Sequence, residues 1–352
     1  MRRIYLDHHA TTPLDPRVSE VMLRALTTAQ AGGWPPPPEG AAVSALIGAA
    51  SGGVCWTSGA TEANRLALQG GGRVITTAVE HASLYRAGGS RVIRLPVDGQ
   101  GRIDPDALRS ALREPAAWVS IQHANNEVGV VQDLAALAAV AAEAGTPLHS
   151  DVTQSAGLLP IEADRIGLSA VSLSAHKLGG PQGIGALWSR TPRRREGALD
   201  EAWMVGLEAA AALALTERSA RAERLRGLRD RLWERLLETI PELDLNGPPL
   251  AARHPGNLHV HLRLVDAERL ARDVGDRLAI STGAACASAG AGPSHVLLAM
   301  GLDEERARAS IRLGVGVTTT EDEVDEAAAI LARAVRAQRD RSPLWRATAS
   351  PA

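Results

Sequence analysis

The stretch that decides the fold runs from Leu148 to Gly185 and reads LHSDVTQSAGLLPIEADRIGLSAVSLSAHKLGGPQGIG. An acid, Asp151, stands at the end of a short apolar run, and a lysine, Lys177, follows a second apolar run. Ser174 and His176 precede this lysine and two glycines follow closely behind it, so small residues leave space around the amine. Such a lysine is a candidate for Schiff-base chemistry, which needs a desolvated amine with room for a bulky partner.

The acid upstream of the lysine indicates which cofactor such an amine would hold. In enzymes that use pyridoxal phosphate, a lysine binds the aldehyde of the cofactor and an acid is held against its pyridinium nitrogen. Asp151 and Lys177 are therefore predicted to lie around the same aromatic ring.

Length, composition and charge restrict the class of protein. At 352 residues and 45% hydrophobic content, the chain is long enough for two domains with substantial cores and is not typical of disorder. Its formal net charge of −2 provides no general attraction to nucleic acid. The start of the chain has no apolar signal core, and no later window resembles a membrane span. We therefore expect a soluble cytoplasmic protein that binds neither nucleic acid nor a membrane.

Apolar strand-like runs alternate with alanine-rich helical runs, which is the pattern of a doubly wound α/β sheet. The expected strands lie at residues 4–6, 54–56, 74–77, 92–95, 118–122, 147–148 and 170–173. The expected helices lie at residues 15–26, 62–68, 105–112, 134–143 and 205–240. After a boundary at 246–249, a smaller α+β domain is predicted from strands at 257–264, 278–280 and 310–313 and helices at 266–274 and 321–336.

Several polar turns follow the predicted strands. Residues 57–64, TSGATEAN, read as a tight turn into a helix and are a candidate phosphate cradle, with a plain helix cap as the alternative. His81 stands near the carboxyl end of a strand, where open α/β sheets keep their ligands, although a lone histidine at such a place is more often structural. The turn 123–129 also follows a strand. These turns are expected to converge on one edge of the sheet.

The two cysteines, Cys55 and Cys286, differ in their surroundings. Two cysteines cannot make a disulfide framework, and they fit a reducing compartment. Cys55 lies in an apolar run and is interpreted as an inert core residue. Cys286 lies in a loop, residues 281–293, made almost wholly of Gly, Ala and Ser. A thiol in such a loop is a candidate nucleophile beside a cofactor, with a tolerated surface cysteine as the alternative.

Matching stretches now indicate a family. YLDHHATTPLDPRV, WTSGATEANRLAL, EHASL, NNEVGVVQD, SDVTQSAG, SAHKLGGPQGIGALW, STGAACASAG and SIRLGVG resemble the cysteine desulfurases, class V aminotransferase-like enzymes that use pyridoxal phosphate. Within that family the chain is similar to the group with a long catalytic-cysteine loop, the type found in iron–sulfur cluster assembly and nitrogen fixation. The resemblance extends from Ile4 to about Trp345.

The resemblance implies a fold and a division into domains. It implies fold type I of the pyridoxal-phosphate-dependent transferases, an α/β fold with a mostly parallel seven-stranded sheet and helices on both faces. Residues 13–247 would form the large cofactor-binding domain, and residues 1–12 and 248–352 a small domain that carries the catalytic loop.

The resemblance also implies how the cofactor would be held. Lys177 matches the lysine that forms the Schiff base, and Asp151 the acid that binds the pyridine nitrogen. His81 matches the histidine that stacks on the ring and takes part in proton transfer. Gln154 matches the residue that contacts the phenolic oxygen. The matches to phosphate ligands are Thr61, Ser174 and His176. No metal site is implied.

The implied substrate is L-cysteine. Asn126 and Arg312 match the pair that holds its carboxylate, a task that suits the two-pronged guanidinium of arginine. Cys286 matches the nucleophile that takes the sulfur as a persulfide and releases L-alanine. A sulfur-accepting protein, such as an iron–sulfur scaffold, is the implied partner, and a homodimer the implied assembly. The identity of the acceptor stays open, because iron–sulfur assembly, tRNA thiolation and other sulfur pathways all use such a persulfide.

Two segments depart from the family. The region from Gly32 to Gly40, with an expected extended run of prolines at 35–38, replaces a GNPSSxHxxG-like segment. Ser189 to Trp203, SRTPRRREGALDEAW, is shorter than the family's GGGQERGxRxGT-like loop and lacks the threonine that reaches the phosphate of the neighbouring subunit. Losing one charge-assisted hydrogen bond would weaken cofactor binding by about 1.5 to 3 kcal/mol.

Two other functions remain open at this point. The rebuilt loops are compatible with a related lyase, such as a selenocysteine lyase or another β-eliminating enzyme, which need not depend on Cys286. They are also compatible with a non-catalytic scaffold protein, which would show no cofactor absorption even after pyridoxal phosphate is added.

Overall fold

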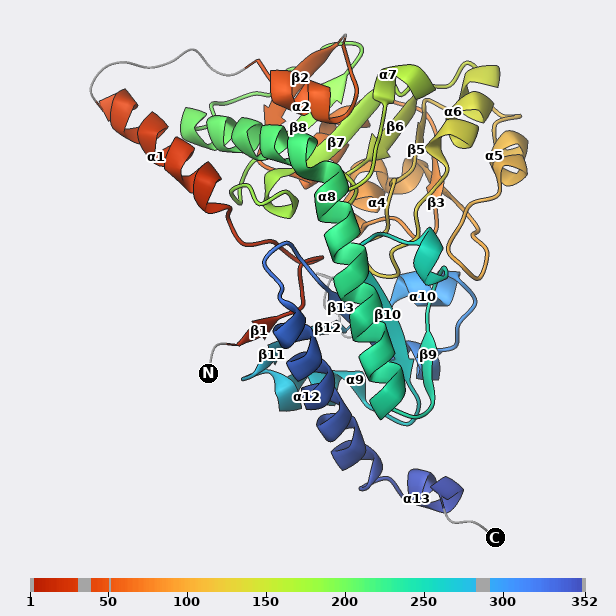
Figure 1. Ribbon diagram of the computed structural model, residues 1–352. Helices are drawn as coiled ribbons and strands as arrows, with labels where there is room; N and C mark the ends of the chain where they lie inside the picture. The colour runs from red at the N-terminus through yellow and green to blue at the C-terminus, as the bar shows by residue number, and fades with distance from the viewer. Residues whose placement is uncertain (1–2, 31–38, 51, 283–291, 350–352) are drawn as a thin grey trace.

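The computed structural model describes residues 3–30, 39–50, 52–282 and 292–349. Its described part contains a seven-stranded sheet at one end of the molecule and a four-stranded sheet at the other (Figure 1). The larger sheet has, in spatial order, β2 (Gly53–Thr57), β8 (Gly185–Ser189), β7 (Ala170–Ser174), β6 (Leu148–Asp151), β5 (Trp118–Ser120), β3 (Val74–Thr77) and β4 (Val92–Leu95). Six of the seven strands run in one direction and only β8 runs in the other, so the predicted mostly parallel seven-stranded sheet is confirmed.

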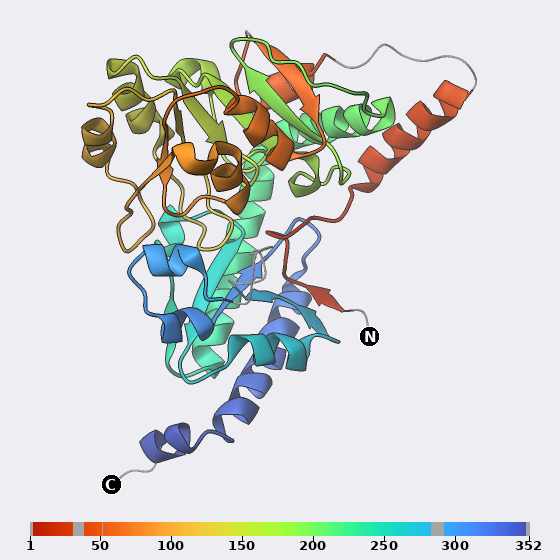
Figure 2. The same cartoon turned by 180° about the vertical axis from the view of Figure 1, so that it is seen from behind.

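Helices cover both faces of this sheet, which explains why its strands β3, β6, β7 and β8 are buried along their whole length. On one face pack α2 (Ala41–Leu46), α5 (Pro105–Ala111), α6 (Leu134–Glu143), α7 (Ala163–Ile166) and the start of α8 (Glu201–Thr239). On the other face pack α3 (Ala60–Ala67) and α4 (Ala82–Gly88), which the reverse view brings to the front (Figure 2). Cys55 lies in this second core at 8% exposure, as expected for an inert thiol.

The smaller sheet is antiparallel and is formed mainly by the last third of the chain. Its strands are, in spatial order, β12 (Ser281–Thr282), β13 (Ser310–Gly314), β10 (Asn257–Leu262) and β9 (Leu243–Leu245). The helices of this part are α9 (Ala267–Val274), α10 (His295–Ala299), α11 (Glu304–Arg308), α12 (Glu321–Arg339) and α13 (Pro343–Ala349). The N-terminal strand β1 (Ile4–Tyr5) pairs in parallel with β11 (Leu278–Ala279), so the start of the chain packs in the part formed by its last third.

The 39-residue helix α8 links the two sheets (Figure 1). Leu207 and Ala214 in its first half pack in the core of the large sheet. Leu225 and Leu236 in its second half pack in the core of the small sheet. One helix therefore contributes to both cores. The predicted domain boundaries at residues 12 and 247 stay a prediction.

Most predicted elements are present, and the differences have local causes. Helix α8 begins at Glu201 rather than at residue 205, because the Asp200 side chain accepts a hydrogen bond from the Ala202 amide at 2.9 Å and caps it. Strand β6 extends beyond residue 148 because polar His149 finds partners in the sheet, Ser120 and Ser172, at 2.7 and 2.8 Å. Strand β8 was not predicted, and neither were the short strands β9 and β12 or the short helices α2, α4, α7, α10, α11 and α13.

Helix α1 (Pro16–Gln30) extends past the predicted end at residue 26. The proline run at 35–38 and the centre of the cysteine loop, 283–291, lie outside the described residues. None of the described helices has the length and apolar content that a membrane crossing requires.

Candidate active site

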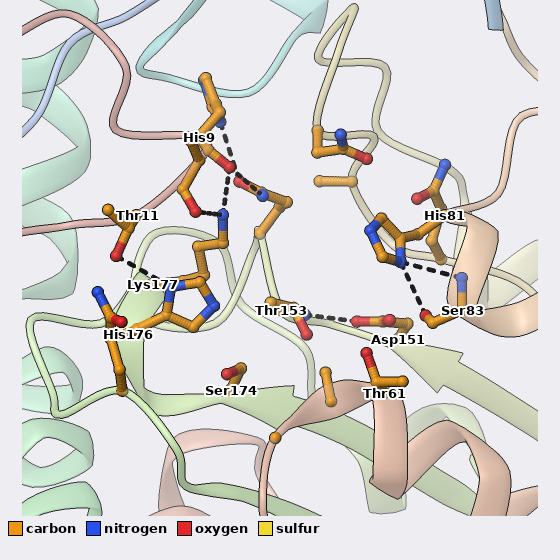
Figure 3. A pocket seen from close by; sticks show the side chains of 18 of the residues that line it. His9, Thr11, Thr61, His81, Ser83, Asp151, Thr153, Ser174, His176 and Lys177 are labelled. Atoms are coloured by element: carbon orange, nitrogen blue, oxygen red, sulfur yellow. Dashed lines mark hydrogen bonds between the residues drawn. The ribbon is translucent and has the colours of Figure 1, made fainter. Parts of the chain in front are cut away.

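A cavity of about 580 Å³ opens at the edge of the large sheet where the parallel strands end. It collects side chains from the N-terminal segment, the turn before α3, the strand ends and the turn after β7, and many of them point toward a common centre (Figure 3). Of the residues predicted for the site, the described ones on its wall are Thr61, His81, Asn126, Asp151, Gln154, Ser174, His176 and Lys177.

Lys177 ends a single 3₁₀ turn, Ala175–Lys177, that follows β7. Its Nζ donates hydrogen bonds to the backbone carbonyl oxygens of His9 and Ala10, the latter at 2.6 Å. A Cβ on Gly180 would lie 2.9 Å from the Ala175 Cβ, so only glycine lets the chain turn back here. The amine is therefore held beside the cavity by backbone oxygens of a distant segment.

Asp151 is the last residue of β6 and is 8% exposed. Its Oδ2 accepts a hydrogen bond from Asn64 Nδ2 at 2.9 Å, and its Oδ1 accepts one from the Thr153 amide at 3.0 Å. These two donors fix the carboxylate in one orientation on the cavity wall. A fixed carboxylate of this kind suits a cationic ring nitrogen.

His81 caps the start of α4 and faces the same space (Figure 3). Its Nδ1 accepts a hydrogen bond from the Ser83 amide at 3.2 Å, so in the neutral ring the proton is on Nε2. Burial lowers the pKa of His81 below 6.5, against the opposing effect of Asp151. Asn64 also donates to Ser83 Oγ at 3.1 Å, and this hydroxyl lies 2.8 Å from His81 Nδ1. A chain of hydrogen bonds thus joins the carboxylate to the imidazole.

The turn Ser58–Thr61 leads into α3 as predicted, although its last two residues already belong to the helix, which begins at Ala60 rather than at residue 62. Gly59 has φ +149°, a conformation that favours glycine, and no side chain caps the helix at this position. The first N–H groups of a helix have no partner within the helix and can hold an anion. Ser174 and His176 lie on the same cavity wall as this turn. Burial, and then the charge of Lys177, lower the pKa of His176 to about 4, so this imidazole is neutral at pH 7.

The shortened segment 189–203 reaches this turn through a salt bridge. Arg195 Nε lies 3.0 and 3.1 Å from the two carboxylate oxygens of Glu62, in the first turn of α3. The same carboxylate accepts a hydrogen bond from the Ser58 amide at 2.7 Å. The arginine therefore neutralises a negative charge beside the candidate phosphate cradle.

The pair predicted for the substrate carboxylate is only partly on the cavity wall. Asn126 lines the cavity, whereas Arg312, 1% exposed, is absent from the described lining residues. Arg312 Nη1 donates to the Asn126 backbone oxygen at 3.0 Å, and Nη2 lies 2.7 Å from Asp7 Oδ1. The predicted nucleophile Cys286 lies outside the described residues.

The sequence alone assigned no role in the site to His9, Ala10 and Thr11, which the structure places on the cavity wall. Thr11 Oγ1 lies 3.1 Å from His176 Nδ1. The polar run HHATT, residues 8–12, follows a predicted strand, as the other turns of the site do, and this pattern could have placed these residues in the site. Among the described residues, no group of three His, Cys, Asp or Glu side chains is arranged to hold a metal ion.

Known proteins show the same architecture and related sequences. The family model for Aminotransferase class-V matches residues 40–196 and 188–327. "Cysteine desulfurase IscS" of Anaeromyxobacter dehalogenans (strain 2CP-C) is 39% identical over 384 residues, covering 97% of this chain and 95% of that protein. The protein of the same name from Escherichia coli O139:H28 is 38% identical over 386 residues, with the same coverage. These alignments are longer than the 352-residue chain and so contain gaps in it, in keeping with shortened loops.

Solved structures agree with the sequence comparison. The NifS-like protein from Rickettsia africae ESF-5 superimposes with a TM-score of 0.81 at 25% identity, covering 96% of this chain and 100% of that one. The apo cysteine desulfurase from Thermococcus onnurineus NA1 shares the fold with a TM-score of 0.80 at 19% identity, covering 95% of each chain. By family model, sequence and fold together, the chain belongs to the class-V aminotransferases and, within them, to the cysteine desulfurases.

Proposed function

We propose that the cavity binds pyridoxal phosphate and converts L-cysteine to L-alanine, with the sulfur transferred to Cys286 as a persulfide. The observation that carries this proposal is that Lys177 and Asp151 line one cavity together with the turn Ser58–Thr61. An amine, a fixed carboxylate and a helix N-terminus are the three groups that the aldehyde, the ring nitrogen and the phosphate of this cofactor require.

The donor set fits the cofactor at each of these points. Lys177 would hold the aldehyde and Asp151 the ring nitrogen, while the turn before α3, with Ser174 and His176, would hold the phosphate. His81 would lie over the ring, since it lines the same cavity. Pyridoxal phosphate, when bound, supplies an electron-withdrawing ring that stabilises negative charge at the α-carbon of the substrate.

The residues of this chain would then bind the substrate and move its protons. Asn126 and Arg312 would hold the carboxylate of cysteine. Arg312 would have to share its guanidinium between Asp7 and the substrate, because it already lies 2.7 Å from Asp7. The Lys177 amine, once the substrate amine has replaced it, would take the α-proton as a general base. The neutral imidazole of His81 would serve as a second proton carrier above the ring.

The sulfur would move in one displacement. The thiolate of Cys286 attacks the sulfur of the substrate, so a sulfur–sulfur bond forms while the carbon–sulfur bond breaks. The electron pair of the broken bond stays with the carbon skeleton, which takes up protons and leaves as alanine. Cys286 keeps the sulfur as a persulfide.

The partners follow from this product. A persulfide has to be passed on, so we propose a sulfur-accepting protein, for which an iron–sulfur scaffold is one chemical class. We also propose a homodimer and a cytoplasmic location, on the similarity to the cysteine desulfurases.

The test is incubation of the purified protein with pyridoxal phosphate and cysteine, measuring alanine, sulfide and labelled sulfur on Cys286. We expect Lys177→Ala to lose the visible absorbance of the lysine-bound cofactor. We expect Cys286→Ser to keep this absorbance but to stop sulfide release. Full sulfide release by Cys286→Ser would instead support the lyase, and no absorbance in the wild type would support the scaffold protein.

A further inference from the structure

The side-chain amide of Gln154 is held at both of its polar atoms by a single residue, His9. Gln154 Oε1 lies 2.9 Å from His9 Nδ1, and Gln154 Nε2 donates to the His9 backbone oxygen at 3.1 Å. Lys177 Nζ donates to this same backbone oxygen. His9 therefore contacts two of the groups proposed to touch the cofactor, and it is 3% exposed.

Hydrogen-bond chemistry permits only one orientation of this amide. A backbone carbonyl oxygen accepts and cannot donate, so the group of Gln154 that faces it must be the NH₂. Gln154 Oε1 then faces the imidazole, and His9 Nδ1 must carry the proton that it accepts. Turning the amide over would bring two acceptors together at His9 O. The second N–H of Gln154 is left for the cavity that this residue lines.

A second histidine holds the backbone of the same glutamine. His254 Nδ1 accepts a hydrogen bond from the Gly256 amide at 3.2 Å, so its proton is on Nε2, which lies 2.9 Å from the Gln154 backbone oxygen. The His9 and His254 rings meet edge to face with centroids 4.8 Å apart. The glutamine is thus fixed by its backbone and by its side chain.

The protonation state of His9 supports the same arrangement. Burial, and then the nearby His254, Arg312 and Lys177, lower the pKa of His9 well below 6.5, so the ring is neutral at pH 7. A neutral imidazole has one proton, and the contact with Gln154 Oε1 places it on Nδ1.

We propose that His9 is a positioning residue that turns the Gln154 amide so that one N–H is presented to the phenolic oxygen of bound pyridoxal phosphate. This inference rests on the proposed function. A donor at that oxygen stabilises negative charge on it, which strengthens cofactor binding and lowers the pH at which the visible band of the lysine-bound cofactor changes.

Two isosteric substitutions test this role. His9→Asn keeps an N–H donor near the place of Nδ1. His9→Leu has about the same shape as His9→Asn but offers no donor. We expect His9→Leu to raise the dissociation constant of pyridoxal phosphate about tenfold and the pH midpoint of the band by about one unit. We expect His9→Asn to stay close to the wild type in both. Lys177, Arg312 and His254, the charged or titratable groups that shift the pKa of His9, are unchanged in both variants.

Controls separate positioning from a loss of structure. His261→Leu makes the same chemical change at a strand position paired with Asp244 and is expected to leave cofactor affinity unchanged. Unfolding temperatures of the cofactor-free variants report stability, and His9→Ala, which adds no bulk, serves if His9→Leu does not fold. With Gln154→Leu as background, His9→Leu is expected to cause no further loss of affinity, because the amide that it orients is gone.

The possible results are distinguishable. If the wild type binds pyridoxal phosphate but His9→Leu or His9→Ala binds it equally well with the same pH midpoint, the positioning role is wrong and the proposed function stands. The positioning role is also wrong if His9→Asn loses as much affinity for pyridoxal phosphate as His9→Leu. It is wrong as well if the affinity losses from His9→Leu and Gln154→Leu are fully additive in the double variant. A wild type that binds no pyridoxal phosphate would overturn both the proposed function and this inference.

Discussion

Arg312 and Asp7 form an ion pair in which arginine Nη2 lies 2.7 Å from aspartate Oδ1. The other oxygen of this aspartate accepts a hydrogen bond from Ser281 Oγ at 2.7 Å. Since Arg312 is the proposed ligand of the substrate carboxylate, cysteine has to approach a guanidinium that already has a carboxylate beside it. The N-terminal segment therefore contacts both Arg312 and Lys177, and we expect it to affect substrate affinity.

Asp7→Asn removes this competing negative charge and keeps a polar side chain of the same shape. We expect the KM for cysteine to fall about tenfold, which corresponds to about 1.4 kcal/mol of substrate binding. We also expect the unfolding temperature to fall, because the buried arginine loses its counter-charge. Steady-state kinetics and thermal unfolding measure the two effects. Asp325→Asn, which breaks a more exposed ion pair with Arg231, is the matched control, and a raised KM in Asp7→Asn would contradict the competition.

Arg195→Ala removes the nearer of two arginines that pair with Glu62 beside the phosphate cradle, since Arg65 Nη2 stays 3.7 Å from the same carboxylate. Because the pair is partly solvated, we expect a modest effect, with the dissociation constant of pyridoxal phosphate rising about fivefold, or about 1 kcal/mol. Adding Glu62→Gln should restore affinity, since the repelling charge is then removed. Cofactor titrations at low and high salt measure this, and the effect should shrink at high salt. An unchanged affinity at low salt would rule out this electrostatic role.

Gly185→Ala would disturb the same cradle from the sheet side. A Cβ on Gly185 would lie 2.6 Å from the Leu173 carbonyl oxygen and 2.7 Å from the Gly59 Cα, so the backbone must shift. We expect a loss of about 1 to 3 kcal/mol in the free energy of unfolding, together with weaker cofactor binding. Gly227→Ala in α8 is the control, because its Cβ would meet nothing within 4 Å and should stabilise the helix by about 1 kcal/mol. Urea unfolding measures both variants, and equal free energies of unfolding would contradict this prediction.

Acid should destabilise the cofactor-free protein below pH 6.5. Burial lowers the pKa values of several histidines from 6.5, to about 4 for His8, His123, His149, His176 and His254 and to about 3 for His259. These rings are neutral in the fold, while the unfolded chain takes up protons as the pH falls through 6.5. Their contribution to stability is therefore complete above pH 6.5 and is lost progressively toward pH 4.

Buried carboxyl groups act in the opposite direction over part of this range. Burial raises the pKa of Glu80 to about 8, so lowering the pH from 8 toward 4.5 relieves the cost of its charge. The histidines outnumber it, so the unfolding temperature should fall between pH 6.5 and 5, and more steeply in Glu80→Gln. Circular dichroism melts at a series of pH values measure this, and a constant unfolding temperature across that interval would refute it.

The sequence by itself determined the elements and the main members of the site. Strands β3 and β4 and helix α6 have the predicted bounds, because β-branched or alanine-rich runs and flanking polar turns mark them locally. Parallel strands end at one edge of a sheet, so the turns at Ser58–Thr61, His81 and Asp151 had to converge once the strands were known. The lysine after β7 belonged to the same edge.

Only the tertiary structure decided what surrounds these groups. His9 meets Gln154 and Lys177 across 145 and 168 residues of sequence. The N-terminal segment is held there on both sides of His9, by the pairing of β1 with β11 and by the Thr12 amide, which donates to the His176 oxygen at 2.8 Å. Arg195 meets Glu62 only because the segment after β8 folds back over α3. Local periodicity and turn residues specify a helix or strand within a few residues of sequence. The contacts of His9 and Arg195 depend instead on how the formed elements pack against each other. The sequence around either residue therefore does not indicate which distant residue it will contact.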